Sequence, residues 1–173
     1  RKQYGPGEIN YPLFPDQPLS TYQSFVLRNS GNDWLNSMMR DGTLTGLMKD
    51  AGLEYQAYRP AVTYLNGEYW GFMEMREILD ENWVEQNHGI DNDMATVISY
   101  KGGINVVNGS DASFWPMFDY ITNTDPNDPS FFETVSTMLD IENYADYIIA
   151  ETYWCNGDWS SGWSNNTKFW HND

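Results

Sequence analysis

Two β-rich runs stand on either side of an Asn-Gly pair in the first half of the chain. Residues 61–65 and 69–73 are rich in Val, Tyr, Trp and Phe, and Asn66-Gly67 lies between them. An Asn-Gly pair tolerates the positive φ angles of a type I′ turn, which joins two antiparallel strands tightly. The pattern therefore predicts a β-hairpin centred on Asn66-Gly67.

Apolar residues at helical spacing predict five helices elsewhere in the chain. Asp33 is suited to begin the first of them as an N-cap, Gly52 to end it, and Gly89 to end the second. The fifth has the clearest apolar face, and it is expected to be a buried helix. The predicted helices cover residues 33–52, 76–87, 111–121, a segment from about 130, and a segment around 141–152.

The remaining pattern completes an α+β prediction. Four prolines make residues 1–24 an extended, irregular arm. Because strands cluster early and helices late, we expect a strand-rich part over about 1–78 and a mainly helical part over about 79–173 of one domain. Further short strands are predicted at residues 24–27, 96–100, 104–107 and 167–170.

Composition and charge narrow the classes of partner. The chain has 173 residues, 16% of them aromatic, so it is expected to fold around a core. Nine basic and twenty-five acidic residues give a net charge of -16. This charge repels nucleic-acid phosphates and anionic membranes and attracts basic peptides or divalent cations. We therefore expect no nucleic-acid partner.

Several other classes of site or segment are also disfavoured. A single cysteine, Cys155, allows no intrachain disulfide and no Cys-built zinc site. His88 and His171 do not have the spacing of a zinc protease. No apolar run approaches the roughly 18–20 residues that cross a bilayer. The chain starts at Arg1 within charged, strand-like sequence, so we expect a targeting segment upstream.

The densest polar cluster follows the last predicted helix. Asn156-Gly157-Asp158-Trp159 is followed by Asn165, Asn166 and Lys168 in a loop that leads to a strand. A carboxylate there could orient an attacking hydroxyl, an amide oxygen could help to hold Mg²⁺, and Lys168 could neutralise a phosphate. The same residue types are also those that any tight turn prefers.

The chain resembles the spore-coat-protein-H (CotH) family of atypical, secreted protein kinases over nearly its whole length. The run Leu27-Arg28-Asn29-Ser30-Gly31-Asn32-Asp33-Trp34 is its most specific feature. Other matching segments, in order, are 1–5, 11–14, 39–41, 55–60, 65–71, Arg76-Glu77, 89–91, 156–159 and 166–170.

The resemblance implies a divergent protein-kinase-like fold, with a strand-rich lobe and a helical lobe closing on ATP. It makes Asp158 the catalytic carboxylate and Asn166, or its neighbour Asn165, the metal-binding amide. Arg76 and Glu77 would lie near the adenine, although packing between the lobes is an equal alternative for them.

Two departures qualify this assignment. An ordinary kinase places the metal-binding Asn five residues after the catalytic Asp, whereas Asn165 and Asn166 follow Asp158 by seven and eight. The family's phosphate-contacting Lys and its second metal-binding Asp are expected outside this chain, so the isolated chain is expected to be inactive.

Two groups of polar residues near the start of the first predicted helix have open roles. Arg28, Asn32 and Asp33 could organise a nucleotide site, or only cap the helix and pair with each other, and the structural role is favoured. Arg40-Asp41 could supply the charge partner that a kinase needs behind its phosphate-binding Lys, but a solvated surface pair is the commoner outcome.

These observations predict an atypical kinase that transfers the γ-phosphoryl group of ATP, with Mg²⁺, to Ser or Thr of secreted or cell-surface proteins. Its acidic surface would favour basic substrate segments. The alternative is a non-catalytic adhesion or carbohydrate-associated module on the same fold, with Trp154, Trp159, Trp163 and Trp170 as a sugar-stacking surface or as core.

Overall fold

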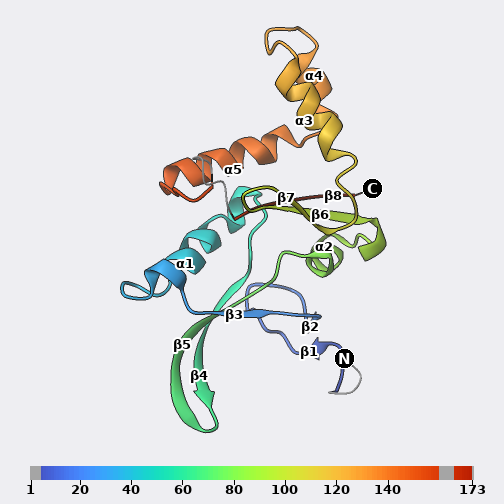
Figure 1. Cartoon of the computed structure of the whole chain (residues 1–173). Helices are drawn as coiled ribbons and strands as arrows, with labels where there is room; N and C mark the ends of the chain where they lie inside the picture. The colour runs from blue at the N-terminus through green and yellow to red at the C-terminus, as the bar shows by residue number, and fades with distance from the viewer. Residues whose placement is uncertain (1–4, 160–165, 173) are drawn as a thin grey trace. The chain divides into compact units, whose positions relative to one another are not determined.

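Figure 1 shows the computed structural model, which describes residues 5–159 and 166–172. In these residues the chain forms five α-helices and three small antiparallel sheets. The predicted α+β class is therefore confirmed. The chain divides into two units, Arg1–Gly89 and Ile90–Asp173.

The predicted hairpin forms the centre of the first unit. Strands β4 (Tyr58–Leu65) and β5 (Glu68–Arg76) pair so that Leu65 faces Glu68 across the Asn66-Gly67 turn. Both turn residues have positive φ, 52° and 85°, as a type I′ turn requires. Strand β3 (Val26–Arg28) pairs with the far end of β5, which gives a sheet of order β3-β5-β4.

The helix expected from Arg76 begins later than predicted. Arg76 is the last residue of β5 and pairs with both Val26 and Tyr58, so its conformation is set by two neighbouring strands. Helix α2 (Glu81–His88) starts after Asp80, whose carboxylate accepts a hydrogen bond from the Trp83 amide at 3.0 Å. Its predicted end is confirmed, because Gly89 takes the left-handed conformation with φ 69°.

The helix expected over residues 33–52 is much shorter than predicted. Gly31–Asp33 forms a 3-10 turn (η2), and helix α1 extends only over Arg40–Leu47, followed by the 3-10 turn η3 (Lys49–Ala51). Met38 has φ 59°, which breaks the helical path just before α1. Gly52, with φ 73°, ends the segment as predicted.

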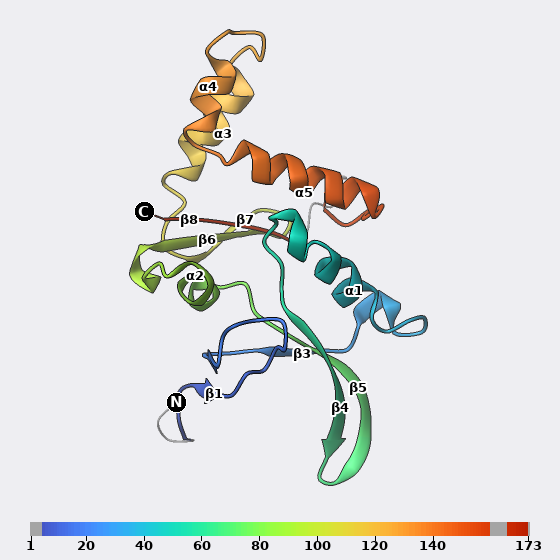
Figure 2. The same ribbon diagram turned by 180° about the vertical axis from the view of Figure 1, so that it is seen from behind.

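The described part of the proline-rich arm, residues 5–24, is mostly irregular, as predicted, but it also contains the short paired strands β1 (Ile9–Asn10) and β2 (Thr21–Tyr22). Phe14 and Tyr22, both 1% exposed, contact each other edge to face and form a core with Leu13 and Ala57. Figure 2 shows this arm beside the β3-β5-β4 sheet.

The two faces of that sheet have different partners. Met75 packs against the core of the arm, and Arg59 donates a hydrogen bond to the Leu13 carbonyl at 3.1 Å. Side chains alternate between faces along a strand, so the neighbouring Tyr58 and Arg76 lie on the opposite face, where α1 packs.

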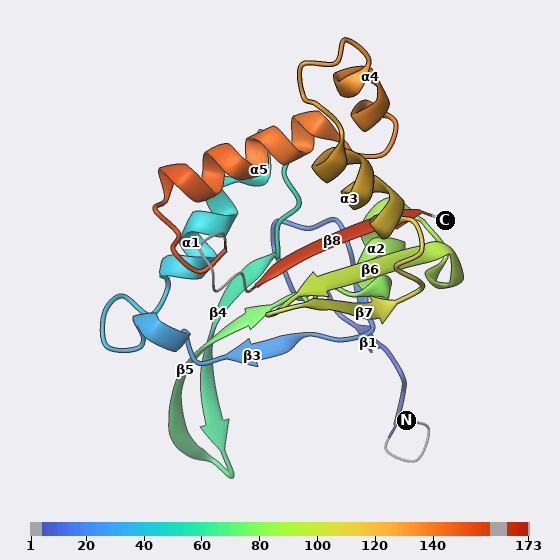
Figure 3. The same cartoon turned by 45° about the horizontal axis from the view of Figure 1, so that its top comes forward.

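The second unit is built on a sheet of order β7-β6-β8 (Figure 3). Its strands are β6 (Ala95–Tyr100), β7 (Ile104–Asn108) and β8 (Thr167–Asn172), which confirms the three strands predicted there. The central strand β6 follows a 3-10 turn, η4 (Asn92–Met94), and its first four residues are at most 2% exposed.

Three helices belong to this unit: α3 (Phe114–Asn123), α4 (Phe131–Ser136) and α5 (Ile141–Tyr153). Phe114 of α3 stacks on Phe169 of β8, with ring centroids 5.6 Å apart. Asp140 caps α5 by accepting a hydrogen bond from the Asn143 amide. The expectation that α5 is buried is wrong, because none of its residues is buried. None of the described helices has the length and apolar character to cross a membrane.

Candidate functional site

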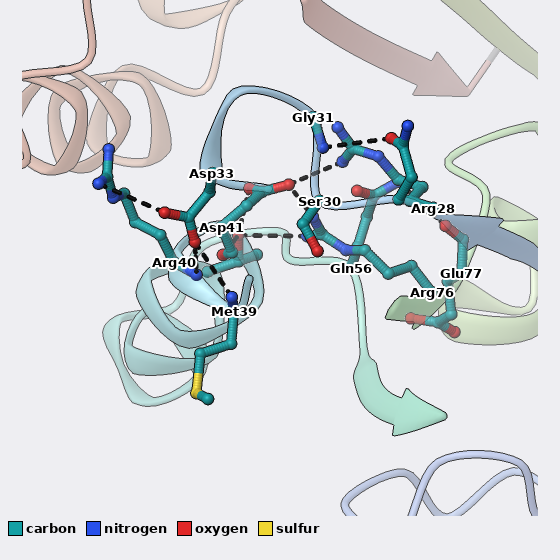
Figure 4. A network of polar contacts seen from close by, with 12 residues as sticks. Arg28, Ser30, Gly31, Asp33, Met39, Arg40, Asp41, Gln56, Arg76 and Glu77 are labelled. Atoms are coloured by element: carbon teal, nitrogen blue, oxygen red, sulfur yellow. Dashed lines mark hydrogen bonds and ion pairs between the residues drawn. The ribbon is translucent and has the colours of Figure 1, made fainter. Parts of the chain in front are cut away.

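A cluster of charged side chains lies between α1 and the β3-β5-β4 sheet (Figure 4). Asp41, in the first turn of α1, accepts hydrogen bonds on its Oδ2 atom from Arg28 of β3, at 2.7 Å, and from Arg76 of β5. Arg28 and Asp41 are about half exposed, whereas the Arg76 side chain is 1% exposed. One carboxylate oxygen therefore joins an accessible cation and a buried one.

Asp33 fixes the start of α1 without being its first residue. Its carboxylate accepts hydrogen bonds from the amides of Met39 and Arg40, at 3.1 and 3.0 Å, and from the Ser37 hydroxyl at 2.5 Å. The Ser37 hydroxyl and then the Arg40 amide are the main causes that lower the pKa of Asp33 to about 2. The side chain thus caps α1 from the preceding loop, six and seven residues upstream.

Glu74 is a second acidic residue of the cluster and is 1% exposed. It lies on β5 opposite Arg28 and two residues before Arg76, so these side chains share a sheet face. Neither of its carboxylate oxygens accepts a hydrogen bond from the part of the chain that the structure describes. Burial raises the pKa of Glu74, and the positive charge of Arg76 opposes this shift.

Glu77 follows β5 and is also buried, at 2% exposed. Its Oε2 atom accepts hydrogen bonds from the Ala57 amide at 2.9 Å and from the Trp83 indole at 3.2 Å. Burial raises the pKa of Glu77, and these two donors partly oppose the shift. Glu77 thereby ties the end of the sheet to α2.

Asp158 lies in the second unit, in a turn directly after α5. Its amide donates to the Asn156 side chain at 3.0 Å, and the Asn156 amide group donates to Glu151 of α5 at 2.6 Å. Trp159 packs edge to face on Tyr147, with centroids 5.7 Å apart. The turn is therefore attached to α5 on both sides of Asp158, whose side chain is exposed.

Asn166 and Lys168 lie where the chain enters β8. Asn166 is exposed and has a left-handed φ of 67°, and Lys168 is exposed on β8 opposite Ser99. Asn165 lies outside the described residues, as does Trp163.

The predicted site residues thus fall into two groups. Arg76 and Glu77 are buried in the first unit, and Asp158, Asn166 and Lys168 are exposed in the second. Their predicted roles remain predictions.

Sequence reasoning missed Glu74 and the sharing of Asp41 by two arginines. The only available signal was that two charged residues, Glu74 and Arg76, are two positions apart on β5. Side chains alternate between the faces of a strand, so this spacing places both on one face.

Each unit by itself offers polar groups of a type that could serve a nucleotide. In the first unit, Arg28 uses one guanidinium nitrogen for Asp41 and has further N–H donors, which suit phosphate oxygens. In the second unit, Asp158 and Asn166 carry carboxylate and amide oxygens, which are the ligand types that Mg²⁺ prefers. Among the described residues, no three His, Cys, Asp or Glu side chains are grouped as a metal site.

Comparison with known proteins identifies one family. A family model described as "CotH kinase protein" matches residues 6–173. No curated protein and no solved structure matches the chain significantly.

Proposed function

The chain belongs to the CotH kinase protein family, and on that basis we propose that it is part of a kinase that transfers the γ-phosphoryl group of ATP to Ser or Thr hydroxyl groups of proteins. The transfer requires Mg²⁺ to neutralise the phosphates.

The ion pair between Arg28 and Asp41 is the observation that carries this proposal. In protein kinases a basic side chain on a strand pairs with an acidic side chain of the helix packed on that sheet, and this pair orients the phosphates. Arg28 on β3 and Asp41 on α1 stand in this relationship at 2.7 Å. The pair is half exposed, so the remaining guanidinium donors are open to a phosphate.

Arg28 takes the phosphate-contacting role in this proposal, which the family resemblance led us to expect of an upstream lysine. Arginine keeps its charge at every physiological pH and can bond two phosphate oxygens at once. Asp41 Oδ2 binds the Nη1 atom of the guanidinium, and we assign the other N–H groups of the guanidinium to the nucleotide.

Asp158 and Asn166 take the remaining roles. Asp158 accepts or orients the proton of the attacking hydroxyl, for which an exposed carboxylate on a fixed turn is suited. Asn166 contributes an amide oxygen to Mg²⁺. Lys168, two residues further on, supplies a positive charge for a phosphate.

The charge distribution supports basic substrates. No Lys, Arg or His occurs between Lys101 and Lys168, whereas ten acidic residues do. Such a stretch attracts Lys- and Arg-containing segments around an acceptor Ser or Thr. The ten acidic residues of this stretch are Asp111, Asp119, Asp125, Asp128, Glu133, Asp140, Glu142, Asp146, Glu151 and Asp158.

We propose that these basic substrates are secreted or cell-surface proteins.

The test is transfer of labelled phosphate from ATP, with Mg²⁺, by the full-length protein and by Asp158→Ala and Arg28→Met variants. Both variants are expected to lose at least about a hundredfold in kcat while keeping the wild-type circular dichroism spectrum, because each removes a group that acts on the transferred phosphoryl group or its acceptor.

Asp93→Ala is the matched control, because Asp93 is an exposed acidic residue of the second unit that lies outside the acidic stretch between Lys101 and Lys168. It is expected to retain wild-type transfer. Equal activity in Asp158→Ala and wild type would exclude Asp158. Absence of both transfer and nucleotide binding in the wild type would favour a non-catalytic module.

A further inference from the structure

The Arg76 guanidinium contacts two residues on one face of α1. It donates from Nη1 to Asp41 Oδ2 and from Nη2 to Thr45 Oγ1, the latter at 3.2 Å. Residues four apart lie one above the other on a helix. The planar guanidinium therefore spans one turn of α1, as the single ammonium of a lysine could not.

The Arg28–Asp41 pair needs such support. Both side chains are about half exposed, and an ion pair in that environment contributes little to stability, too little to hold a helix in place. Arg76 is 1% exposed and rises from the central strand of the sheet, so it is the fixed member of the cluster.

We infer that Arg76 is a positioning residue for the proposed phosphoryl transfer: it holds α1 on the sheet so that the Asp41 carboxylate stays beside Arg28. This inference rests on the proposed function for its effect on activity. Its structural part, the attachment of α1 through Arg76, does not depend on any reaction.

The burial of Arg76 also argues against direct contact with a nucleotide in the first unit. Its two Nη atoms are engaged by α1, and its Nε atom is buried and has no acceptor among the described residues. Glu74, on the same strand and face, supplies a second carboxyl group beside it. Two guanidinium groups and two carboxyl groups thus form one layer between α1 and the sheet.

The test compares Arg76→Lys, Arg76→Met and Thr45→Val in the full-length protein by two readouts. Hydrogen–deuterium exchange of the peptide that covers α1 is measured without nucleotide. The kcat for transfer and the KM for ATP are measured with Mg²⁺.

Arg76→Met is expected to show faster exchange in α1 and a loss of about ten- to a hundredfold in kcat, because catalysis depends steeply on the position of the reacting groups. Its KM is expected to change much less.

The two conservative variants, Arg76→Lys and Thr45→Val, are expected to show smaller changes in exchange and kcat than Arg76→Met. Arg76→Lys keeps the charge and is expected to recover part of both losses. Thr45→Val removes only the neutral partner and is expected to give a smaller change of the same kind. If Arg76→Met does not fold, these two variants decide the question, and wild-type exchange and kinetics in both would overturn the inference.

Arg59→Met is the matched control, because Arg59 lies on the opposite face of the sheet and bonds the arm. It is expected to leave exchange in α1 unchanged. Faster exchange of α1 in Arg76→Met, in a protein whose wild type transfers no phosphate, would refute the proposed function and keep the positioning role. Unchanged exchange with unchanged kcat in Arg76→Met would refute the positioning role alone.

Discussion

Gly42 of α1 lies so close to the ring of Tyr58 on β4 that a Cβ atom at residue 42 would stand 2.4 Å from Cδ2 of that ring. The Cγ atom of the ring would be only 2.6 Å away, so the ring cannot avoid the clash by moving its far end. The separation between α1 and the sheet is therefore set by the absence of a side chain at residue 42, and Asp41 is next to it in sequence.

Gly42→Ala is expected to push α1 away from the sheet and to destabilise the protein by about 1–3 kcal/mol, the usual cost of overpacking. The separation of Asp41 from Arg28 should increase as well, so activity should fall with stability. Chemical denaturation measures the first effect, and exchange of the α1 peptide measures the second.

Gly46→Ala provides the control on the same helix. A Cβ atom there meets nothing within 4 Å. Because alanine favours a helix by about 1 kcal/mol over glycine, this change should stabilise the protein slightly. Equal effects of the two substitutions would show that the contact with Tyr58 does not limit the packing of α1.

Asp33→Asn is expected to loosen the start of α1, since an uncharged amide is a weaker acceptor for the Met39 and Arg40 amides. In the wild type the pKa of Asp33 is lowered from 3.8 to about 2. Its stabilising effect is therefore complete above about pH 4 and is lost as the pH falls towards 2. Unfolding measured between pH 2 and pH 5 should show this slope in the wild type and a smaller slope in the variant.

Glu74→Gln is expected to change how the stability of the protein depends on pH at higher pH, whereas Asp33 affects stability below about pH 4. Burial raises the pKa of Glu74, so the folded protein holds this proton more tightly than the unfolded chain does. Its contribution is present at low pH and is lost as the pH rises through the raised pKa. The variant should therefore lose less stability than the wild type as the pH rises above about 4.5, and parallel curves would contradict this explanation.

Trp83→Phe is expected to cost about 1–3 kcal/mol, because it leaves the buried Oε2 atom of Glu77 without its indole donor. The pKa of Glu77 should rise further, and the deficit should grow with pH. The control is Trp115→Phe, which removes an indole donor to Asp111 at an exposed position. That change should alter stability by no more than about 0.5 kcal/mol.

Local chemistry explains which elements were predictable. The Asn66-Gly67 turn and the end of α2 at Gly89 need particular backbone angles, and the residues that allow them are visible in the sequence. The strands of the second unit are short β-rich runs bounded by turn residues, and they too were located correctly.

The failures come from contacts distant in sequence. Arg76 is compatible with the first turn of a helix, yet pairing with Val26 and Tyr58 makes it strand. Asp33 was predicted to be the N-cap of a helix that begins there, whereas the N-cap of α1 is Met39. The Asp33 carboxylate instead accepts hydrogen bonds from the Met39 and Arg40 amides beyond a loop that the periodicity does not reveal.

The candidate site was predictable only in part. Asp158 was predicted from its turn and from the family resemblance; the structure shows that the residue is exposed, and its catalytic role stays a prediction. The Arg28–Asp41 pair was not predicted, because it joins residues on different elements and spacing alone does not reveal it; the sequence only left Arg40-Asp41 open between a nucleotide site and a surface pair.

Arg28 and Arg76 bind the same oxygen of Asp41, and this has a consequence for the evolution of the family. Loss of the Asp41 carboxylate would leave the buried Arg76 guanidinium without this partner. Loss of the Arg76 guanidinium would leave the carboxylate without the contact that fixes its position. A substitution at one of these three positions therefore favours the selection of compensating substitutions at the other two. Across related sequences we expect the trio to covary, being inherited intact or replaced together.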